Sequence, residues 1–126
     1  MIVVADSSVL IDLLRHRPEA TRLFLEIAES DDDLWSATIV RTEVLTGMRP
    51  MEKLATMQLL GQIRWKDVTC EVADRAGELA RLYFRSHRGI DALDYITAAA
   101  TQILGGRLLT RNVKHFPMFA GLKPAY

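Results

Sequence analysis

Short apolar runs alternate with amphipathic segments along most of the chain. The apolar runs predict buried strands, and apolar residues that recur every three or four positions predict helices that bury one face. The predicted strands span residues 2–5, 34–37, 63–68 and 107–110. The predicted helices span residues 8–14, 18–30, 38–47, 51–62, 71–87 and 91–104, with one further helical turn between 113 and 119.

Polar residues, prolines and glycines mark the ends of these elements. Ser7 or Ser8 can cap the first helix and Thr38 the third, because a hydroxyl oxygen accepts hydrogen bonds from the free N–H groups of a first turn. Pro18 suits the start of the second helix. The Gly105–Gly106 pair ends the sixth, since glycine readily adopts the backbone conformation of a helix C-cap.

Strands that alternate with helices predict an α/β fold, in which helices flank both faces of a central, mostly parallel sheet of four or five strands. No internal repeat or linker divides the chain, so we expect residues 1–126 to form a single domain. Ligands of such sheets bind beyond the carboxyl ends of the strands. The candidate site residues therefore follow the strands, and they are Asp6, Ser7 and Ser8, residues 38–43, and Thr110, Arg111 and Asn112.

Two groups of acids allow both a structural and a functional interpretation. Asp6 follows four apolar residues, so its carboxylate is expected at the edge of the core, either as a helix cap or in a site. Asp91 and Asp94 lie three positions apart on one helix face and repel each other. Asp91 can be a cap stabilised by the helix dipole. Asp94 precedes an apolar stretch and is expected on a more buried face.

Glu43 lies among apolar residues of a short helix, either as a solvated glutamate or as a further acid of the same site. If the first strand is central, the ends of three strands and the start of the sixth helix can face one crevice. Crowded carboxylates cannot all ionise without cations. The oxygen ligands favour Mg²⁺ or Mn²⁺, and the scattered histidines argue against zinc.

Such a cluster suits the hydrolysis of phosphodiesters, because divalent cations acidify water and stabilise the leaving oxygen. Asp6, Glu43 and Asp94 would be the metal ligands, and Asp91 a further ligand or a base. Thr110 and Asn112 would hold a water or orient the phosphate. No covalent nucleophile is required.

The overall charge gives no electrostatic case for a nucleic-acid partner, since 16 Lys and Arg balance 16 Asp and Glu. Residues 31–33 are acidic, and the stretch from Arg75 to Arg88 is basic. A solvated surface is the simple interpretation of both segments, and guidance of RNA phosphates is the alternative for the basic one.

The chain shows no sign of export or membrane insertion. Cys70 is the single cysteine, no leader-like segment opens the chain, and we expect a cytoplasmic protein without disulfides. No apolar run approaches the roughly 20 residues that cross a bilayer, so no association with a membrane is expected.

Four sequence blocks together resemble a PIN domain, and specifically the VapC-type toxins of bacterial type II toxin–antitoxin pairs. They are VADSSVL at 4–10, TEVLTG at 42–47, DALDYITAA at 91–99 and LTRNVKHF at 109–116. In this order and at these separations the resemblance spans essentially the whole chain.

The resemblance implies an endoribonuclease that uses Mg²⁺ or Mn²⁺ to cut structured RNA, such as transfer or ribosomal RNA. It places Asp6, Glu43 and Asp94 at the three acidic metal-site positions. Family members often carry a further acid where this chain has Asn112, whose neutral amide weakens a second metal site. Asp91 can partly substitute for that acid.

The resemblance also implies two protein partners. One is a second copy of the chain in a homodimer, and the other is a cognate antitoxin that inhibits the toxin by binding an apolar groove. Candidates for this groove are the region of Met48, Met51 and Met57 and the helix near Leu23 and Phe24, although ordinary core packing is the simpler interpretation of each methionine.

Two other classes of function remain as alternatives. A phosphoacceptor or receiver-like domain would use Asp6 with the Lys123–Pro124 pair, but no isolated aspartate ends the third strand and no helix follows Lys123. A non-catalytic interaction module would keep the sheet without the metal, and the presence of all three acids argues against it.

Overall fold

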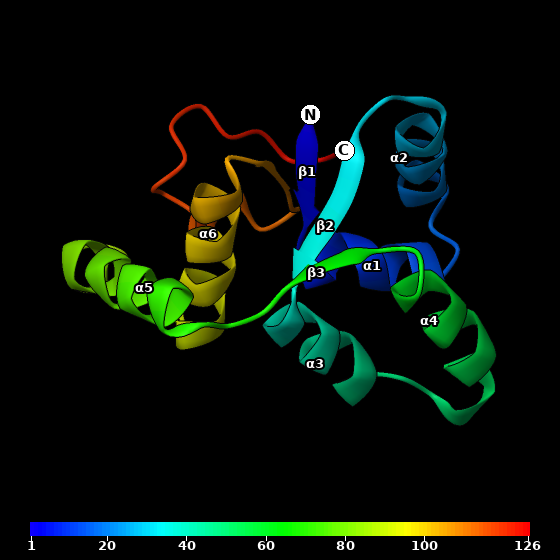
Figure 1. The fold of residues 1–126 in the computed structure, drawn as a ribbon, viewed down its shortest axis with the longest axis horizontal. Helices are drawn as coiled ribbons and strands as arrows, with labels where there is room; N and C mark the ends of the chain where they lie inside the picture. Colours follow the sequence, from blue (N-terminus) through cyan, green and yellow to red (C-terminus); the bar gives the residue numbers. More distant parts are fainter.

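A four-stranded sheet forms the centre of the protein in the computed structural model, which describes residues 1–126 (Figure 1). The strands, in the order in which they lie side by side, are β3 (Arg64–Lys66), β2 (Asp33–Ala37), β1 (Ile2–Ala5) and β4 (Arg107–Leu109). Every neighbouring pair is parallel, which confirms the predicted mostly parallel sheet, and β1 lies between β2 and β4, the arrangement that the expected crevice requires. The carboxyl ends of all four strands therefore meet at one edge of the sheet.

Six α-helices surround the sheet, and they are α1 (Ser7–Leu14), α2 (Pro18–Glu29), α3 (Thr38–Thr46), α4 (Lys53–Leu60), α5 (Cys70–Tyr83) and α6 (Ala92–Leu104). Helices α5 and α6 lie on one side of the sheet, and α1, α2 and α4 on the other (Figure 1). This three-layer α/β arrangement confirms the predicted fold class. None of the helices combines the length and apolar character required to span a membrane.

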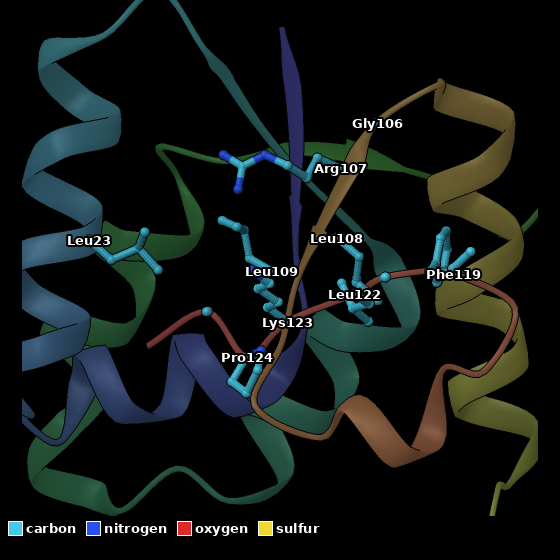
Figure 2. A pocket seen from close by; sticks show the side chains of 12 residues that line it. Leu23, Gly106, Arg107, Leu108, Leu109, Phe119, Leu122, Lys123 and Pro124 are labelled. Carbon is cyan, nitrogen blue, oxygen red and sulfur yellow. The ribbon is translucent and has the colours of Figure 1, made fainter.

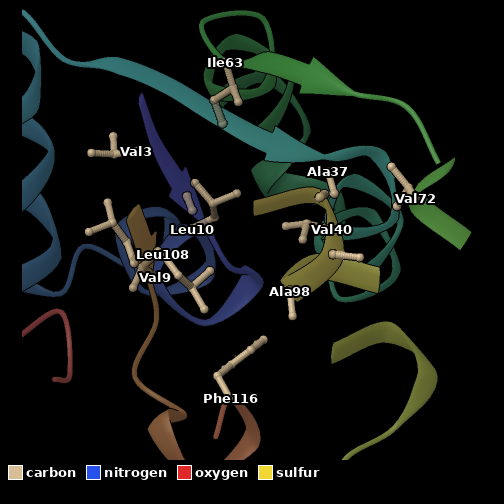
Figure 3. Close-up of a cluster of buried hydrophobic side chains, with 14 of the residues drawn as sticks. Val3, Val9, Leu10, Ala37, Val40, Ile63, Val72, Ala98, Leu108 and Phe116 are labelled. Atoms are coloured by element: carbon tan, nitrogen blue, oxygen red, sulfur yellow. The ribbon is translucent and has the colours of Figure 1, made fainter. Parts of the chain in front are cut away.

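The apolar faces of these elements meet in a cluster of 20 buried residues (Figure 3). Val3 of β1, Leu10 of α1 and Val40 of α3 are fully buried there. Helix α6 contributes three fully buried alanines, Ala98 to Ala100. Because their side chains are small, the helix packs closely against the strands, and its first turn reaches the carboxyl edge of the sheet.

A glycine allows β4 to approach β1 closely. A Cβ atom at Gly106 would lie 2.8 Å from Val4 Cγ2 and 3.3 Å from the Ile2 carbonyl oxygen. Only a residue without a side chain fits this position. The close pairing of β1 and β4 brings residues 6 and 110, which follow these strands, next to each other.

The structure decides between the expected caps of two helices. Asp6, rather than Ser7 or Ser8, is the N-cap of α1, which confirms the capping expectation for Asp6, and its Oδ1 accepts a hydrogen bond from the Ser7 N–H at 2.8 Å. Thr38 is the first residue of α3, and its N-cap Ala37 makes no side-chain capping bond. The prediction for Thr38 was wrong because β2 runs into α3 without an intervening residue.

Four predicted elements are shorter in the structure. Helix α5 ends at Tyr83 rather than His87, and the Tyr83 carbonyl accepts both the His87 N–H at 2.8 Å and the Ser86 hydroxyl at 3.3 Å in the turn that follows. The predicted helix 51–62 begins at Lys53, because Pro50 starts a 3₁₀ turn (Pro50–Glu52). Strand β3 and the second 3₁₀ turn (Val113–His115) likewise occupy only part of their predicted ranges.

Candidate active site

Asp6 lies at the carboxyl end of β1 and is only 4% exposed. Its backbone N–H donates to the Leu109 carbonyl at 2.9 Å, which continues the pairing of β1 with β4. Its Oδ1 caps α1 through the Ser7 N–H. The second carboxylate oxygen, Oδ2, points toward the segment that follows β4, so Asp6 is both a cap and a buried acid of the site.

Two hydroxyl groups hold Asp6 Oδ2. Thr110, which is fully buried, donates to it at 2.7 Å, and Ser8 donates at 3.3 Å. The segment after β4 is fixed in turn, because Thr110 Oγ1 accepts a bond from the Asn112 N–H at 3.0 Å and Ser8 Oγ accepts one from the Arg111 N–H at 3.1 Å. The geometry therefore gives Thr110 a clear contact with the predicted acid.

Asp91 and Asp94 form a reciprocal cap at the start of α6. Asp91 Oδ1 accepts a hydrogen bond from the Asp94 N–H at 3.0 Å, and Asp94 Oδ2 accepts one from the Asp91 N–H at 3.4 Å. Asp94 Oδ2 also lies 3.1 Å from His115 Nδ1. Asp91 is exposed and Asp94 is half-buried, so the capping interpretation holds for Asp91 and the acid nearer the core is Asp94.

Glu43 on α3 belongs to the same electrostatic cluster. Burial raises the pKa of its carboxyl to about 7, and the charges of Asp6, Asp94 and Asp91 raise it further, against a hydrogen bond from Ser7 that lowers it. A carboxyl with this pKa exchanges its proton near neutral pH. The half-buried position of Glu43 and the charges of three other acids favour the site interpretation over a solvated glutamate.

Asp94 shows the same effect. Burial raises the pKa of its carboxyl to about 6, and the charge of Asp91 adds to this. The backbone bond from Asp91 and the charge of His115 act in the opposite direction, and Asp6 raises the pKa slightly further. The four acids, predicted from three separate parts of the chain, are thus near enough to repel one another.

The donor set fits a hard divalent cation that keeps part of its water shell. All the crowded ligand atoms are carboxylate oxygens, which Mg²⁺ and Mn²⁺ prefer. No three Asp, Glu, His or Cys side chains are arranged closely enough to hold one ion directly. Mg²⁺ usually retains several waters and contacts only one or two carboxylates, so the spacing agrees with its coordination.

Two predicted site residues have environments that differ from expectation. The Arg111 guanidinium donates to Asp12 Oδ2 at 3.0 Å, so its side chain is engaged on α1 rather than free for a phosphate. The backbone N–H of Asn112 bonds to Thr110, and the Asn112 side chain is exposed without a hydrogen bond inside the protein.

The sequence analysis missed His115 as part of the site. It included Ser8 among the candidates after the first strand but gave it no role beyond a helix cap, and its hydroxyl bridges Asp6 and the Arg111 N–H. His115 was grouped with two scattered histidines. Its position three residues after Asn112, within the last of the four blocks, is the signal that could have identified it.

A hollow of about 510 Å³ lies apart from the acids, along the outer edge of β4 (Figure 2). Leu23 of α2, Leu108, Leu109 and Lys123 with Pro124 line it (Figure 2). None of the four acids does. The Lys123–Pro124 pair that the receiver-like alternative requires is thus part of a different, mainly apolar surface.

Comparisons with known proteins agree with this arrangement. The model of the PIN domain family matches residues 3–120. The chain is 40% identical to the ribonuclease VapC19 of Mycobacterium tuberculosis over 121 residues, which cover 96% of this chain and 97% of that protein. It is 38% identical over 125 residues to the ribonuclease VapC10 of the same organism, covering 99% and 93%.

A solved structure shows the same fold in a complex. The structure of a toxin–antitoxin complex from Klebsiella pneumoniae superposes with a TM-score of 0.80 at 26% identity, and the match covers 98% of both chains. Neither the receiver-like alternative nor the non-catalytic module gains support from these similarities.

Proposed function

The chain belongs to the PIN-domain family and, within it, to the VapC proteins, and from this premise we propose that it is an endoribonuclease toxin of a toxin–antitoxin pair. Its substrate would be a structured RNA, such as a transfer or ribosomal RNA. Residues 1–126 would act as a single domain. The observation that carries the proposal is the electrostatic cluster of Asp6, Glu43 and Asp94, in which burial and mutual repulsion raise two of the three pKa values.

A divalent cation, Mg²⁺ or Mn²⁺, is the proposed cofactor, and Asp6, Glu43 and Asp94 would hold it in part directly and in part through its retained waters. When bound, such an ion would acidify a water molecule so that it acts as a nucleophile near neutral pH, and it would stabilise negative charge on the phosphodiester. The repulsion among the acids supports this assignment, because a cation removes the cost of keeping them ionised together.

The side chains divide the remaining work. Thr110 and Ser8 fix Asp6 Oδ2, which leaves the carboxylate little freedom to rotate. The Asp91 carboxylate accepts a hydrogen bond from the Asp94 backbone N–H, and the His115 Nδ1 lies against the Asp94 carboxylate. Glu43, whose pKa is about 7 without a cation, would hold the ion in its ionised form, so binding of the cation would release a proton.

Exposed apolar side chains support the proposal of protein partners. Met51 is 98% exposed, Leu54 72% and Met57 42%, all within the 3₁₀ turn and helix that follow α3. A second hollow, of about 320 Å³, lies between α2 and α4 and includes Phe24. An antitoxin segment and a second copy of the chain are the proposed occupants of such surfaces.

Cleavage of defined RNA tests the proposal. Purified protein is incubated with transfer and ribosomal RNA in Mg²⁺, in Mn²⁺ or in chelator, and the new 5′ ends are sequenced. We expect discrete cuts that need the metal and that are lost in Asp6→Asn. The matched control is Asp31→Asn, a substitution of the same kind at an exposed position. Cleavage by Asp6→Asn at the wild-type rate would contradict the proposal.

A further inference from the structure

Asp12 on α1 gathers three side chains from distant parts of the chain, and we call Asp12, Arg17, Arg111 and Tyr126 the Asp12 cluster. Asp12 Oδ2 accepts hydrogen bonds from the Tyr126 hydroxyl at 2.5 Å and from Arg111 Nη1 at 3.0 Å. Arg17 Nη1 lies 3.8 Å from the same oxygen. The guanidinium groups of Arg17 and Arg111 lie 5.5 and 5.6 Å from the centre of the Tyr126 ring.

The contacts of the Asp12 cluster hold its four side chains in one geometry. One carboxylate oxygen receives both a phenol and a guanidinium, and charge-assisted bonds of this kind are short and strong. Burial and the bond to Asp12 raise the pKa of the Tyr126 hydroxyl, so it remains a donor at physiological pH. Cation–π contacts with both arginines add to the attachment of the ring.

Two contacts connect the Asp12 cluster to the acids of the site. Arg111, whose side chain belongs to the cluster, donates its backbone N–H to Ser8 Oγ, and Ser8 in turn donates to Asp6 Oδ2. Next to Tyr126, the Ala125 N–H donates to the Thr110 carbonyl at 2.9 Å. The segment 110–112 is therefore held both through Asp12 and through the residues before Tyr126.

We propose that Asp12 and Tyr126 are positioning residues of the nuclease site. By fixing the segment 110–112 against α1, they keep the Thr110 and Ser8 hydroxyls directed at Asp6. Neither residue contacts Asp6, Glu43, Asp91 or Asp94, the acids of the candidate site. Neither belongs to the four blocks that carry the family resemblance. This inference rests on the proposed function, since it concerns the geometry of the proposed metal ligand Asp6.

The first test measures the segment itself and needs neither metal nor RNA. Amide hydrogen exchange is followed by NMR for Arg111, Asn112 and Ala125 in the full chain. Tyr126→Phe removes one hydroxyl and keeps the ring, so folding is preserved. We expect about tenfold faster exchange at these amides. The matched control is Tyr83→Phe, because the Tyr83 hydroxyl makes no hydrogen bond within the chain and the residue lies on α5.

The second test measures metal binding without catalysis. Free Mn²⁺ is titrated by electron paramagnetic resonance against wild type, Tyr126→Phe, Asp12→Asn and the Tyr83→Phe control. Loss of partners that orient a ligand typically weakens metal binding 10- to 100-fold, so we expect the Kd for Mn²⁺ to rise about tenfold in the first two variants. Cleavage at saturating Mn²⁺ should return to within about twofold of wild type, since the ligands themselves are unchanged.

The outcomes separate this inference from the proposed function. Unchanged exchange in Tyr126→Phe overturns the inference, whether or not the protein cuts RNA. Faster exchange with an unchanged Kd for Mn²⁺ also overturns it, because the cluster would then stabilise the segment without positioning Asp6. A wild-type protein that binds no Mn²⁺ contradicts the proposed function and removes the metal-positioning role with it.

Discussion

Asp6 combines two tasks that usually fall to different residues. One of its oxygens caps α1, and the other meets the hydroxyls of Thr110 and Ser8 in a nearly water-free position. A buried carboxylate is costly unless its lone pairs are occupied. These donors lower the cost while leaving part of the acceptor capacity of Asp6 for a cation.

The raised pKa of Glu43 makes the stability of the metal-free protein dependent on pH. The folded value of about 7 exceeds the reference of 4.5, so the folded state binds the proton more tightly, and stability falls as pH rises from about 4.5 to 7. In chelator at pH 8 we expect Glu43→Gln to be more stable than wild type by about 1–2 kcal/mol, after allowance for solvent screening.

Thermal unfolding at pH 5 and pH 8 measures this difference. The advantage of Glu43→Gln should shrink toward pH 5, and Mg²⁺ at pH 8 should reverse the order of the two proteins. Glu26→Gln, on the exposed surface of α2, is the control. Equal melting temperatures in chelator at pH 8 would show that Glu43 is not crowded.

Thr110→Val tests the bond that Thr110 donates to Asp6. The substitution preserves shape and removes the hydroxyl, so a buried carboxylate oxygen loses its shortest donor. We expect a loss of about 1–2 kcal/mol in the free energy of unfolding, together with weaker RNA cleavage. Thr101→Val is the control, because Thr101 is equally buried but donates only to the Thr97 carbonyl in its own helix. Equal activity losses in both variants would contradict a role for Thr110 in the site.

The acids Asp6 and Asp94 could be predicted from the sequence because the apolar residues around each of them indicate its position in the fold. Asp6 follows an apolar run, and Asp94 lies in the first turn of an apolar helix. The contacts of His115 with Asp94 and of Tyr126 with Asp12 could not be predicted, since these residues meet only through the fold. A hydroxyl or an imidazole has the same local pattern whether it faces solvent or a carboxylate.

Helix α6 is the element in which the residues that cap the helix are also acids of the site. Its reciprocal cap uses both Asp91 and Asp94, so the first turn fixes the backbone from which Asp94 projects. The end of the helix is equally well defined, because Gly105 adopts φ 65° and closes it.

Two substitutions at Asp91 separate capping from metal binding. Serine keeps an N-cap oxygen without the charge, whereas alanine removes both. We expect Asp91→Ala to lose about 1 kcal/mol of stability and Asp91→Ser to lose little. If Asp91 is only a cap, Asp91→Ser also retains most of its RNA cleavage. A large loss of cleavage in Asp91→Ser with unchanged stability would identify Asp91 as a ligand or base.

The positions of the elements were predictable, but several of their ends were not. Periodicity located every helix and strand, and the glycine after α6 marked its end. Helix α5 passes into a turn after Tyr83, and α4 begins only after the 3₁₀ turn at Pro50. Apolar periodicity does not distinguish such turns from helix.

At the scale of the whole molecule, balanced net charge hides an uneven distribution. Arg81, Arg85 and Arg88 lie at the end of α5 and in the loop toward Asp91, and none of them forms an ion pair. Phe84 is 51% exposed in the same region, with the Arg85 guanidinium 5.5 Å from its ring centre. Unpaired cations beside an exposed aromatic ring suit a single-stranded nucleic acid.

Salt dependence of RNA binding tests this region. In Arg85→Ala/Arg88→Ala we expect weaker RNA binding and a slope of log affinity against log salt that is smaller by about 1.5, because two phosphate contacts are lost. Arg22→Ala, an exposed charge on α2, should leave the slope unchanged. An unaltered slope in the double variant would show that Arg85 and Arg88 do not contact RNA phosphates and only form a solvated surface.

The strand order could be predicted only in part. The alternation of strands and helices indicates a parallel sheet, but a central first strand was only a condition for the expected crevice. The pairing of β1 with both β2 and β4 depends on contacts such as Gly106 against Val4, which join opposite ends of the chain.

The bond between Thr110 and Asp6 spans 104 positions of the chain, and this has a consequence for synthesis. On the ribosome, β1 emerges early and can pair with β2, while β4 and the hydroxyl that fixes Asp6 are still untranslated. Domains complete their long-range pairing only after the last participating strand has emerged. If the proposed nuclease function holds, we expect a nascent chain to cut no RNA until translation is nearly finished.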